Sequence, residues 1–143
     1  MIFVNEKDLA FDNVQFQLSA GMYRALCIVI ILNHLLEKIT ACTFAADDIG
    51  EGLDYERSSK LVGLILGRTN NSKIQVILTS NDRHLPNSVD VSHWNVLERK
   101  GGKVRSYNYS NSKEAFDEFM MTGLSTFDLL TGKMYKGVRS KSK

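Results

Sequence analysis

Two short apolar runs separated by a helix-like segment constrain the fold of this chain more than any other feature. Residues 41–46 and 74–79 have the length and apolar character of buried strands, and the second run is rich in β-branched side chains. Between them, residues 55–68 place apolar side chains at helical spacing, after Asp54 at the N-cap position. Strand, helix and strand in this order predict a parallel pair with a right-handed crossover, and therefore an α/β fold.

A longer apolar segment precedes this unit. Residues 22–38 are mostly strong helix formers with apolar side chains on nearly every face, and Ser19 stands at the N-cap position. Its apolar part, residues 25–36, is interrupted only by Asn33 and His34. This stretch is shorter than the roughly 20 residues that cross a bilayer. We therefore expect a helix buried in the middle of a domain, and no membrane association.

Downstream, the pattern changes to a hairpin and a short helix. Residues 93–98 and 103–107 flank a pair of glycines, which predicts a β-hairpin, and residues 112–121 read as an amphipathic helix. No repeat or linker interrupts the chain. We expect one domain over residues 1–132, followed by a basic flexible tail over residues 133–143.

Composition indicates a packed, cytoplasmic protein. Hydrophobic residues make up 43% of the chain, and its net charge is only +2. Such a weak charge does not by itself indicate a nucleic-acid partner. Cys27 and Cys42 lie inside apolar runs without metal-ligand spacing, so we expect reduced thiols. The N-terminal residues lack the pattern of a secretion signal.

Three polar motifs occur in a fixed order along the first half of the chain. They are LSAGM at residues 18–22, DDIGEGLD at residues 47–54 and LTSND at residues 78–82. In order and spacing they resemble the signature motif, the Walker B motif with its D-loop, and the switch loop of ABC-type P-loop ATPases. The resemblance is closer to the chromosome-maintenance, DNA-repair and phage-defence members than to the transporters. It implies a partial P-loop lobe with a mostly parallel sheet, flanking helices and a C-terminal β-hairpin.

The first motif joins a hydroxyl and a glycine to the start of a helix. Ser19 can donate to a phosphate oxygen, Gly21 allows close backbone approach, and the helix N-terminus attracts anions. The resemblance implies that Ser19, Ala20, Gly21 and Met22 contact the γ-phosphate of ATP held by a partner protomer. Taken alone, the same residues are more typical of an ordinary helix start.

The other two motifs supply acidic and amide side chains. The resemblance assigns magnesium binding to Asp47, activation of the attacking water to Asp48 and a dimer-crossing D-loop role to Asp54. At the second of these positions the family usually has Glu, and Asn81 stands where it usually has His. The shorter acid puts the rate of hydrolysis in doubt, and the amide, which cannot titrate, weakens the assignment of the switch role to Asn81. The alternative readings are an acidic loop after a strand and an Asn-Asp turn.

The chain contains no G-x-x-x-x-G-K-[ST] segment, which is the Walker A loop that grips the β- and γ-phosphates. The resemblance therefore implies the C-terminal half of an ATPase, as a fragment, a split subunit or a truncated gene. Its partner would be a second copy or a Walker A-bearing chain. If Met1 is the true start, the sheet lacks its central strand and first helix, and we then expect exposed apolar surface.

Three hypotheses follow. The chain is an ATPase lobe using Mg²⁺ and ATP, or a catalytically silent regulatory module that dimerises, or a DNA-binding module acting through residues 133–143. We favour the first for the parent protein, and leave the first and second open for this chain alone.

Overall fold

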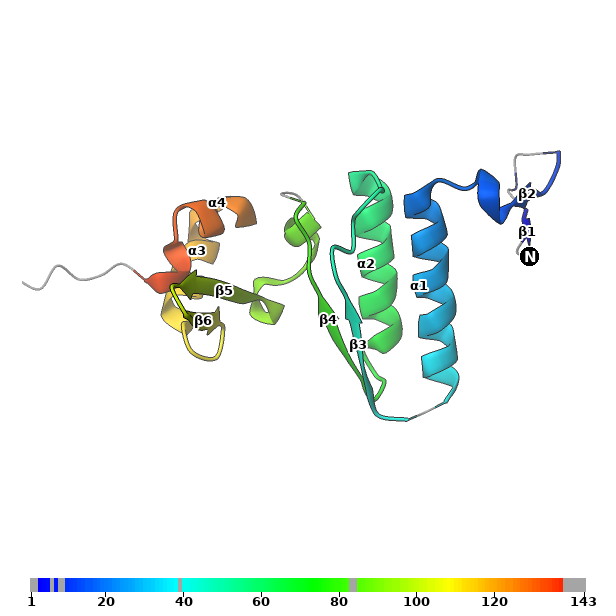
Figure 1. Ribbon diagram of the computed structural model, residues 1–143. Coiled ribbons are helices and arrows are strands. Elements are labelled where there is room, and N and C mark those ends of the chain that lie inside the picture. Colours follow the sequence, from blue (N-terminus) through cyan, green and yellow to red (C-terminus); the bar gives the residue numbers. More distant parts are fainter. Residues whose placement is uncertain (1–2, 6, 8–9, 39, 83–84, 138–143) are drawn as a thin grey trace, which may run out of the picture. The chain divides into compact units, whose positions relative to one another are not determined.

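The computed structural model describes residues 3–5, 7, 10–38, 40–82 and 85–137. They fall into two compact units, Met1–Asn81 and Asp82–Lys143, coloured blue to green and green to red in Figure 1. The sequence predicts one domain over residues 1–132, and the structure differs by placing a boundary within that range. Each unit has its own buried side chains.

The first unit pairs two long helices with a parallel strand pair. Its elements are β1 (Phe3–Val4), β2 (Asn13–Val14), the 3-10 turn η1 (Gln15–Gln17), α1 (Ala20–Glu37), β3 (Cys42–Ala46), α2 (Tyr55–Thr69) and β4 (Ile74–Leu78). Strands β3 and β4 pair in parallel, from Cys42 opposite Ile74 to Ala46 opposite Leu78, which confirms the predicted parallel pair. The predicted helices begin at their predicted caps, Ser19 and Asp54.

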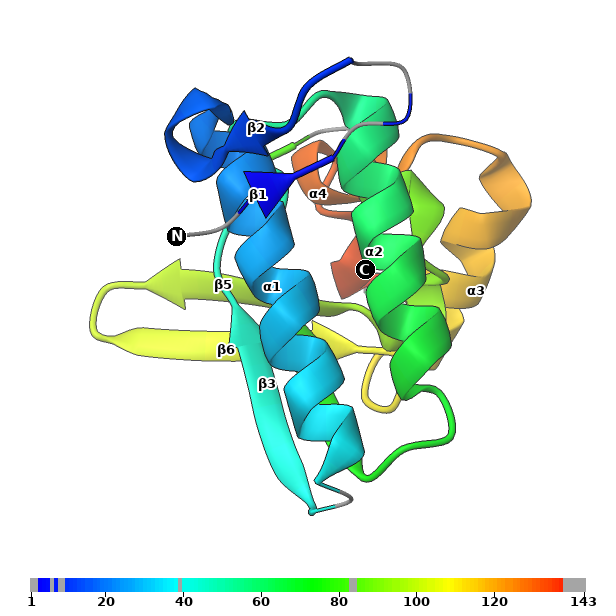
Figure 2. The ribbon, with the colours of Figure 1, turned by 90° about the vertical axis from the view of Figure 1, so that its right-hand side faces the viewer.

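Helices α1 and α2 lie side by side on the same side of the β3–β4 pair (Figures 1 and 2). Phe44 and Ile74 on the strands are buried, as are Leu61 and Ile65 of α2 and Leu32 of α1. Alternate strand residues are exposed on the other face. They are Thr43, Ala45, Gln75 and Ile77. The strand pair is therefore covered on one face by described residues.

The prediction that the first helix lies in the middle of a domain is wrong for this structure. Only Gly21, Ile28 and Leu32 of α1 are buried. Ile30 and Ile31 are 49% and 50% exposed, since no described element covers their side of the helix. With 18 residues and a mean hydropathy of 1.4, α1 is also long and apolar enough to cross a membrane by length and composition alone.

The second unit packs a β-hairpin against short helices. Its elements are the 3-10 turns η2 (Leu85–Ser88) and η3 (Val91–His93), β5 (Asn95–Lys100), β6 (Lys103–Asn108), α3 (Lys113–Thr122), α4 (Thr126–Thr131) and the 3-10 turn η4 (Met134–Lys136). The predicted hairpin is confirmed, with Gly101 at φ 59° in the turn. The described strands thus form three separate two-stranded sheets, two of them antiparallel, where the sequence predicts one mostly parallel sheet.

The core of the second unit is aromatic. Its buried members are Val91, Val96, Phe116, Phe119, Leu129 and Tyr135. Tyr107 packs against Tyr135 with ring centroids 5.0 Å apart. Because Tyr135 is only 5% exposed, the start of the predicted flexible tail belongs to the packed unit. Residues 138–143 of that tail lie outside the described residues.

Candidate functional site

The three sequence motifs meet where β3 and β4 end. Because the strands are parallel, their carboxyl ends share one edge of the sheet. The pairing continues one step beyond the strands, since the Thr79 amide donates to the Ala46 carbonyl over 3.0 Å and the Ile49 amide donates to the Thr79 carbonyl over 2.8 Å. Asp47 and Asp48 are the residues held between these two hydrogen bonds. The acidic motif is thus fixed against the start of the LTSND segment.

The hydroxyl of Thr79 connects both aspartates to the end of β4. Its Oγ1 accepts a hydrogen bond from the Asp48 amide over 2.8 Å and donates one to Asp47 Oδ1. The carboxylate of Asp47 is exposed, and its Oδ2 has no hydrogen-bond partner among the described residues. One oxygen of Asp47 is therefore oriented by the protein, and the other faces solvent.

Asp48 and Asn81, the two predicted catalytic residues, contact each other directly. The Asn81 side-chain amide donates to Asp48 Oδ2 over 3.1 Å, and its main-chain amide donates to Asp48 Oδ1 over 3.3 Å. Asp48 also adopts a left-handed backbone conformation, at φ 46°. Its carboxylate is thus held by the switch segment, with both oxygens accepting hydrogen bonds.

The start of α1 approaches the acidic loop through two glycines. A Cβ placed on Gly21 would lie 2.1 Å from the carbonyl oxygen of Gly52, so the two backbones touch. Gly52 has φ 75°, a conformation that glycine adopts without strain. The LSAGM and DDIGEGLD motifs are thereby brought into contact, although 25 residues of chain lie between residues 21 and 47.

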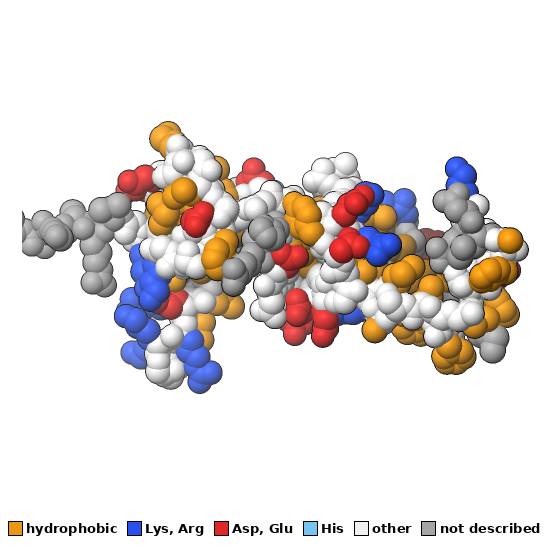
Figure 3. All heavy atoms as spheres, turned by 90° about the horizontal axis from the view of Figure 1, so that it is seen from above, with side chains coloured by type: hydrophobic (Ala, Val, Ile, Leu, Met, Phe, Trp, Pro, Cys, Tyr) orange, Lys and Arg blue, Asp and Glu red, His pale blue; other side chains and the backbone are white. Residues whose placement is uncertain are grey.

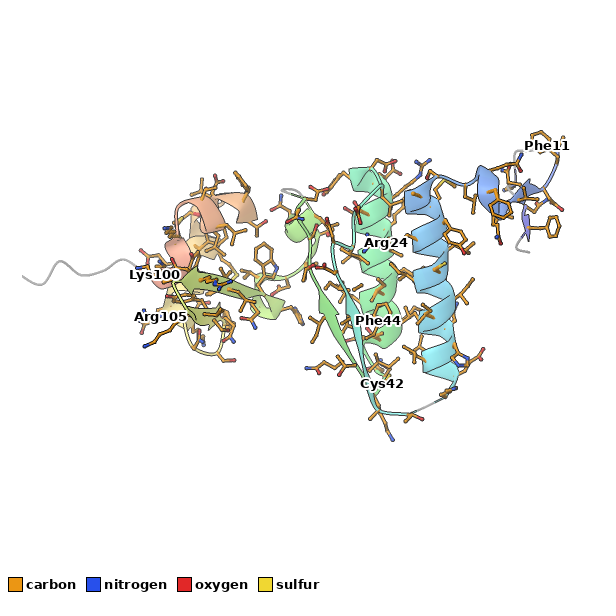
Figure 4. The ribbon with its side chains drawn as sticks, viewed as in Figure 1. Phe11, Arg24, Cys42, Phe44, Lys100 and Arg105 are labelled. Carbon is orange, nitrogen blue, oxygen red and sulfur yellow. The ribbon has the colours of Figure 1, made fainter. Side chains whose placement is uncertain are left out.

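Arg24, which the motif reading did not identify, ties the same loop to α1 (Figure 4). Its guanidinium donates to the carbonyl oxygens of Asp47 and Asp48, the latter over 2.9 Å, and pairs with Glu51 at 2.8 Å. Arg24 lies five residues after Ser19 and is the single basic residue of the motif-bearing half of α1. Its position as a lone cation at the start of an apolar helix was the signal available in the sequence.

Ser19 and Asp54 act as helix caps. Ser19 Oγ accepts from the Met22 amide over 3.2 Å, and Asp54 accepts from the Arg57 amide over 2.8 Å while pairing with the Arg57 guanidinium at 2.9 Å. Ala20 begins α1 and is exposed. Among the described residues, no hydrogen bond joins the side chains of this first turn, or Asp54, to Asp47 or Asp48.

The edge combines carboxylates with helix N-termini. Asp47, Asp48 and Glu51 supply negative charge, Arg24 supplies one cation, and both α1 and α2 begin here, each with its N-cap side chain accepting from a first-turn amide. No group of three or more His, Cys, Asp and Glu residues converges as a metal cage in the described ranges. A hard cation at Asp47 would therefore need water or ligand oxygens for the rest of its coordination shell.

Comparison of the chain with protein-family models, with curated protein sequences and with solved structures finds no match in any of the three. The resemblance to ABC-type ATPases accordingly rests on the order of the motifs.

Proposed function

We propose that this chain is the lobe of an ABC-type ATPase that contributes the signature loop, the Walker B carboxylates and the D-loop to a composite ATP site. The observation that carries the proposal is the convergence of the three motifs. Gly21 touches Gly52, Thr79 binds both aspartates and Asn81 binds Asp48, all at one edge of the sheet. Because the ends of parallel strands share an edge in any case, the support for the proposal comes from these direct contacts and not from the shared edge alone.

Under this proposal, each residue of the site has a role that follows from its position. Asp47 offers its solvent-facing oxygen to Mg²⁺, which neutralises phosphate charge when bound. Asp48 orients the attacking water, and Asn81 fixes the direction of its carboxylate. Arg24 holds the loop that carries both aspartates by binding their carbonyl oxygens. Ser19 and Gly21 present the N-terminus of α1 to a phosphate.

A partner must complete the site, because the sequence contains no Walker A loop. The carboxylates supply no positive charge for the β- and γ-phosphates, and the guanidinium of Arg24 is already paired with Glu51. That loop comes from a second polypeptide or from another segment of a longer chain, and it brings the phosphates to the carboxyl end of β3.

Calorimetry tests this proposal. We expect no heat of Mg·ATP binding from the chain alone, and binding when a Walker A-bearing lobe of an ABC-type ATPase is added. Asp47→Asn should abolish the Mg·ATP binding that appears on adding this lobe. Glu37→Gln, which removes an exposed acid at the far end of α1, should leave that binding unchanged. Binding by the chain alone that disappears in Asp47→Asn would mean that it builds a complete phosphate site, and would refute the half-site.

A catalytically silent regulatory module is the second candidate, and one observation favours it. Both oxygens of Asp48 already accept a hydrogen bond from Asn81, so Asn81 competes with an attacking water for this carboxylate. The complemented lobes distinguish the two candidates. Release of phosphate, lost in Asp48→Asn, supports the ATPase, whereas ATP binding without turnover supports the silent module.

A further inference from the structure

The β5–β6 hairpin of the second unit concentrates positive charge. It carries Arg99, Lys100, Lys103 and Arg105 against a single acid, Glu98, a surplus larger than the net charge of +2 of the whole chain. All four basic residues are exposed. Figure 3 shows the blue side chains gathered on one side of this unit, and Figure 4 labels Lys100 and Arg105 on its strands.

The register places like charges directly opposite each other. Lys100 pairs with Lys103 beside the turn, and Glu98 pairs with Arg105 two steps further in. Like charges directly opposite on two strands are destabilising, so an anion between them would relieve this repulsion. Binding of a polyanion beside Lys100 and Lys103 would therefore stabilise the folded hairpin.

Glu98, the one acid of the hairpin, is already engaged. It forms an ion pair with Lys136 at 2.5 Å, and its side chain is only 14% exposed. Lys136, Lys100 and Lys133 together hold the pKa of Glu98 below its ordinary value, the hydrogen bond from Lys136 being the main cause. No ion pair among the described residues neutralises Lys100, Lys103 or Arg105. Lys133, which is exposed at the N-cap of η4, adds a further positive charge to this unit.

We infer that the β5–β6 hairpin binds the phosphate backbone of duplex nucleic acid through Arg99, Lys100, Lys103 and Arg105. A two-stranded ribbon is narrow enough to enter a major groove, and its lysines and arginines then reach the phosphates on either side. Arg99 is held toward the turn, because its Nε donates to the Gly101 carbonyl over 3.1 Å. Leu97 and Val104 are exposed aliphatic residues on the two strands, and both lie further from the turn than Lys100 and Lys103.

The surroundings favour a duplex over a single strand or a membrane. Single strands are bound by stacking bases on aromatic rings, but Trp94, Tyr107 and Tyr109 are packed against the core of the unit. An interfacial membrane segment presents aromatic or bulky apolar residues at its leading end. Here the leading end is Lys100, two glycines and Lys103.

Fluorescence anisotropy with a labelled duplex DNA of about 20 base pairs tests the inference on the full chain. Replacing both Lys100 and Lys103 by Gln should weaken binding at least ~10-fold at ~50 mM salt, and should lower the slope of log affinity against log salt by about 2. The matched control replaces the exposed Lys38 and Lys73 of the first unit by Gln, which removes the same charge and should change affinity less than ~2-fold. Unchanged circular dichroism and Trp94 fluorescence would show that both variants remain folded.

Three results would overturn the inference. The first is an equal loss of duplex affinity in the variant at Lys100 and Lys103 and in the control at Lys38 and Lys73. The second is loss confined to a variant in which Arg139, Lys141 and Lys143 are replaced by Gln, which would assign binding to the C-terminal residues. The third is binding to single-stranded DNA or to anionic phospholipid vesicles in preference to the duplex.

Discussion

Gly21 and Gly52 are in backbone contact, and a methyl group on Gly21 would lie 2.1 Å from the Gly52 carbonyl oxygen. Gly21→Ala should therefore reduce the free energy of unfolding of the first unit by at least about 2 kcal/mol, because a backbone neighbour cannot turn aside as a flexible side chain can. Urea denaturation followed by circular dichroism measures the change.

Gly63→Ala is the matched control for that substitution. Gly63 lies within α2, and a Cβ there would meet nothing within 4 Å. This variant should gain about 0.5–1 kcal/mol through helix propensity. A Gly21→Ala variant as stable as the control would contradict the observed contact.

Thr79→Val removes the hydroxyl that holds both aspartates while keeping the branched shape that suits the end of a strand. We expect the unfolding free energy to fall by about 1–2 kcal/mol, since one hydrogen bond is lost at each side of the hydroxyl. Thr43→Val, on the exposed face of β3, should change it by less than about 0.5 kcal/mol. Equal effects of the two substitutions would show that the hydroxyl does not fix the acidic loop.

Acid should weaken the second unit through Glu98. The hydrogen bond from Lys136 lowers the pKa of Glu98 below its ordinary 4.5, so ionised Glu98 stabilises the folded unit. This contribution is complete above the ordinary value and is lost as the pH falls through the lowered pKa. Between pH ~5 and ~3, the unfolding midpoint should fall more steeply in the wild type than in Glu98→Gln. The pKa of Asp90 is also lowered, by its hydrogen bonds with Ser92. Asp90 should make the same contribution to the pH dependence of the wild type and of Glu98→Gln.

The two units should unfold in separate transitions. Trp94 is the single tryptophan and packs against the core of the second unit, so its fluorescence reports that unit alone. Gly21→Ala should shift the helical circular dichroism transition, to which α1 and α2 contribute most, and leave the Trp94 midpoint in place. A joint shift of both signals would mean that the units unfold together.

The uncovered side of α1 should cause self-association. Ile30 and Ile31 are each about half exposed. Replacing both by Glu should shift the chain toward monomer in sedimentation velocity, and Leu97→Glu, at an exposed site of the other unit, should not. A wild-type chain that stays monomeric at ~100 µM would remove self-association as the means of covering this helix.

Local signals in the sequence predicted the elements of the first unit well. Ser19 and Asp54 are side-chain caps in the structure as expected, because an N-cap depends on residues only two or three positions apart. The β5–β6 hairpin was equally local, since two adjacent glycines between the strands set its turn. The convergence of Asp48 with Asn81 followed from the parallel order of the strands.

Burial and unit boundaries could not be predicted in the same way. Helix α1 is apolar on nearly every face, a pattern that predicts a central position, yet covering it requires elements that the described chain does not place there. The boundary at Asn81 has no linker composition to mark it. Tyr135 is buried by contacts with distant residues, which the basic sequence around it conceals.

The backbone at Asp48 limits which residues this position can hold. At φ 46°, Asp and Asn are among the few non-glycine residues that are at ease, because their short polar side chains tolerate the left-handed region. A glutamate, the usual residue in the resembling family, would add strain here and displace the hydrogen bonds with Asn81. Introducing a glutamate at position 48 without strain would consequently require a different backbone path through residues 47–52.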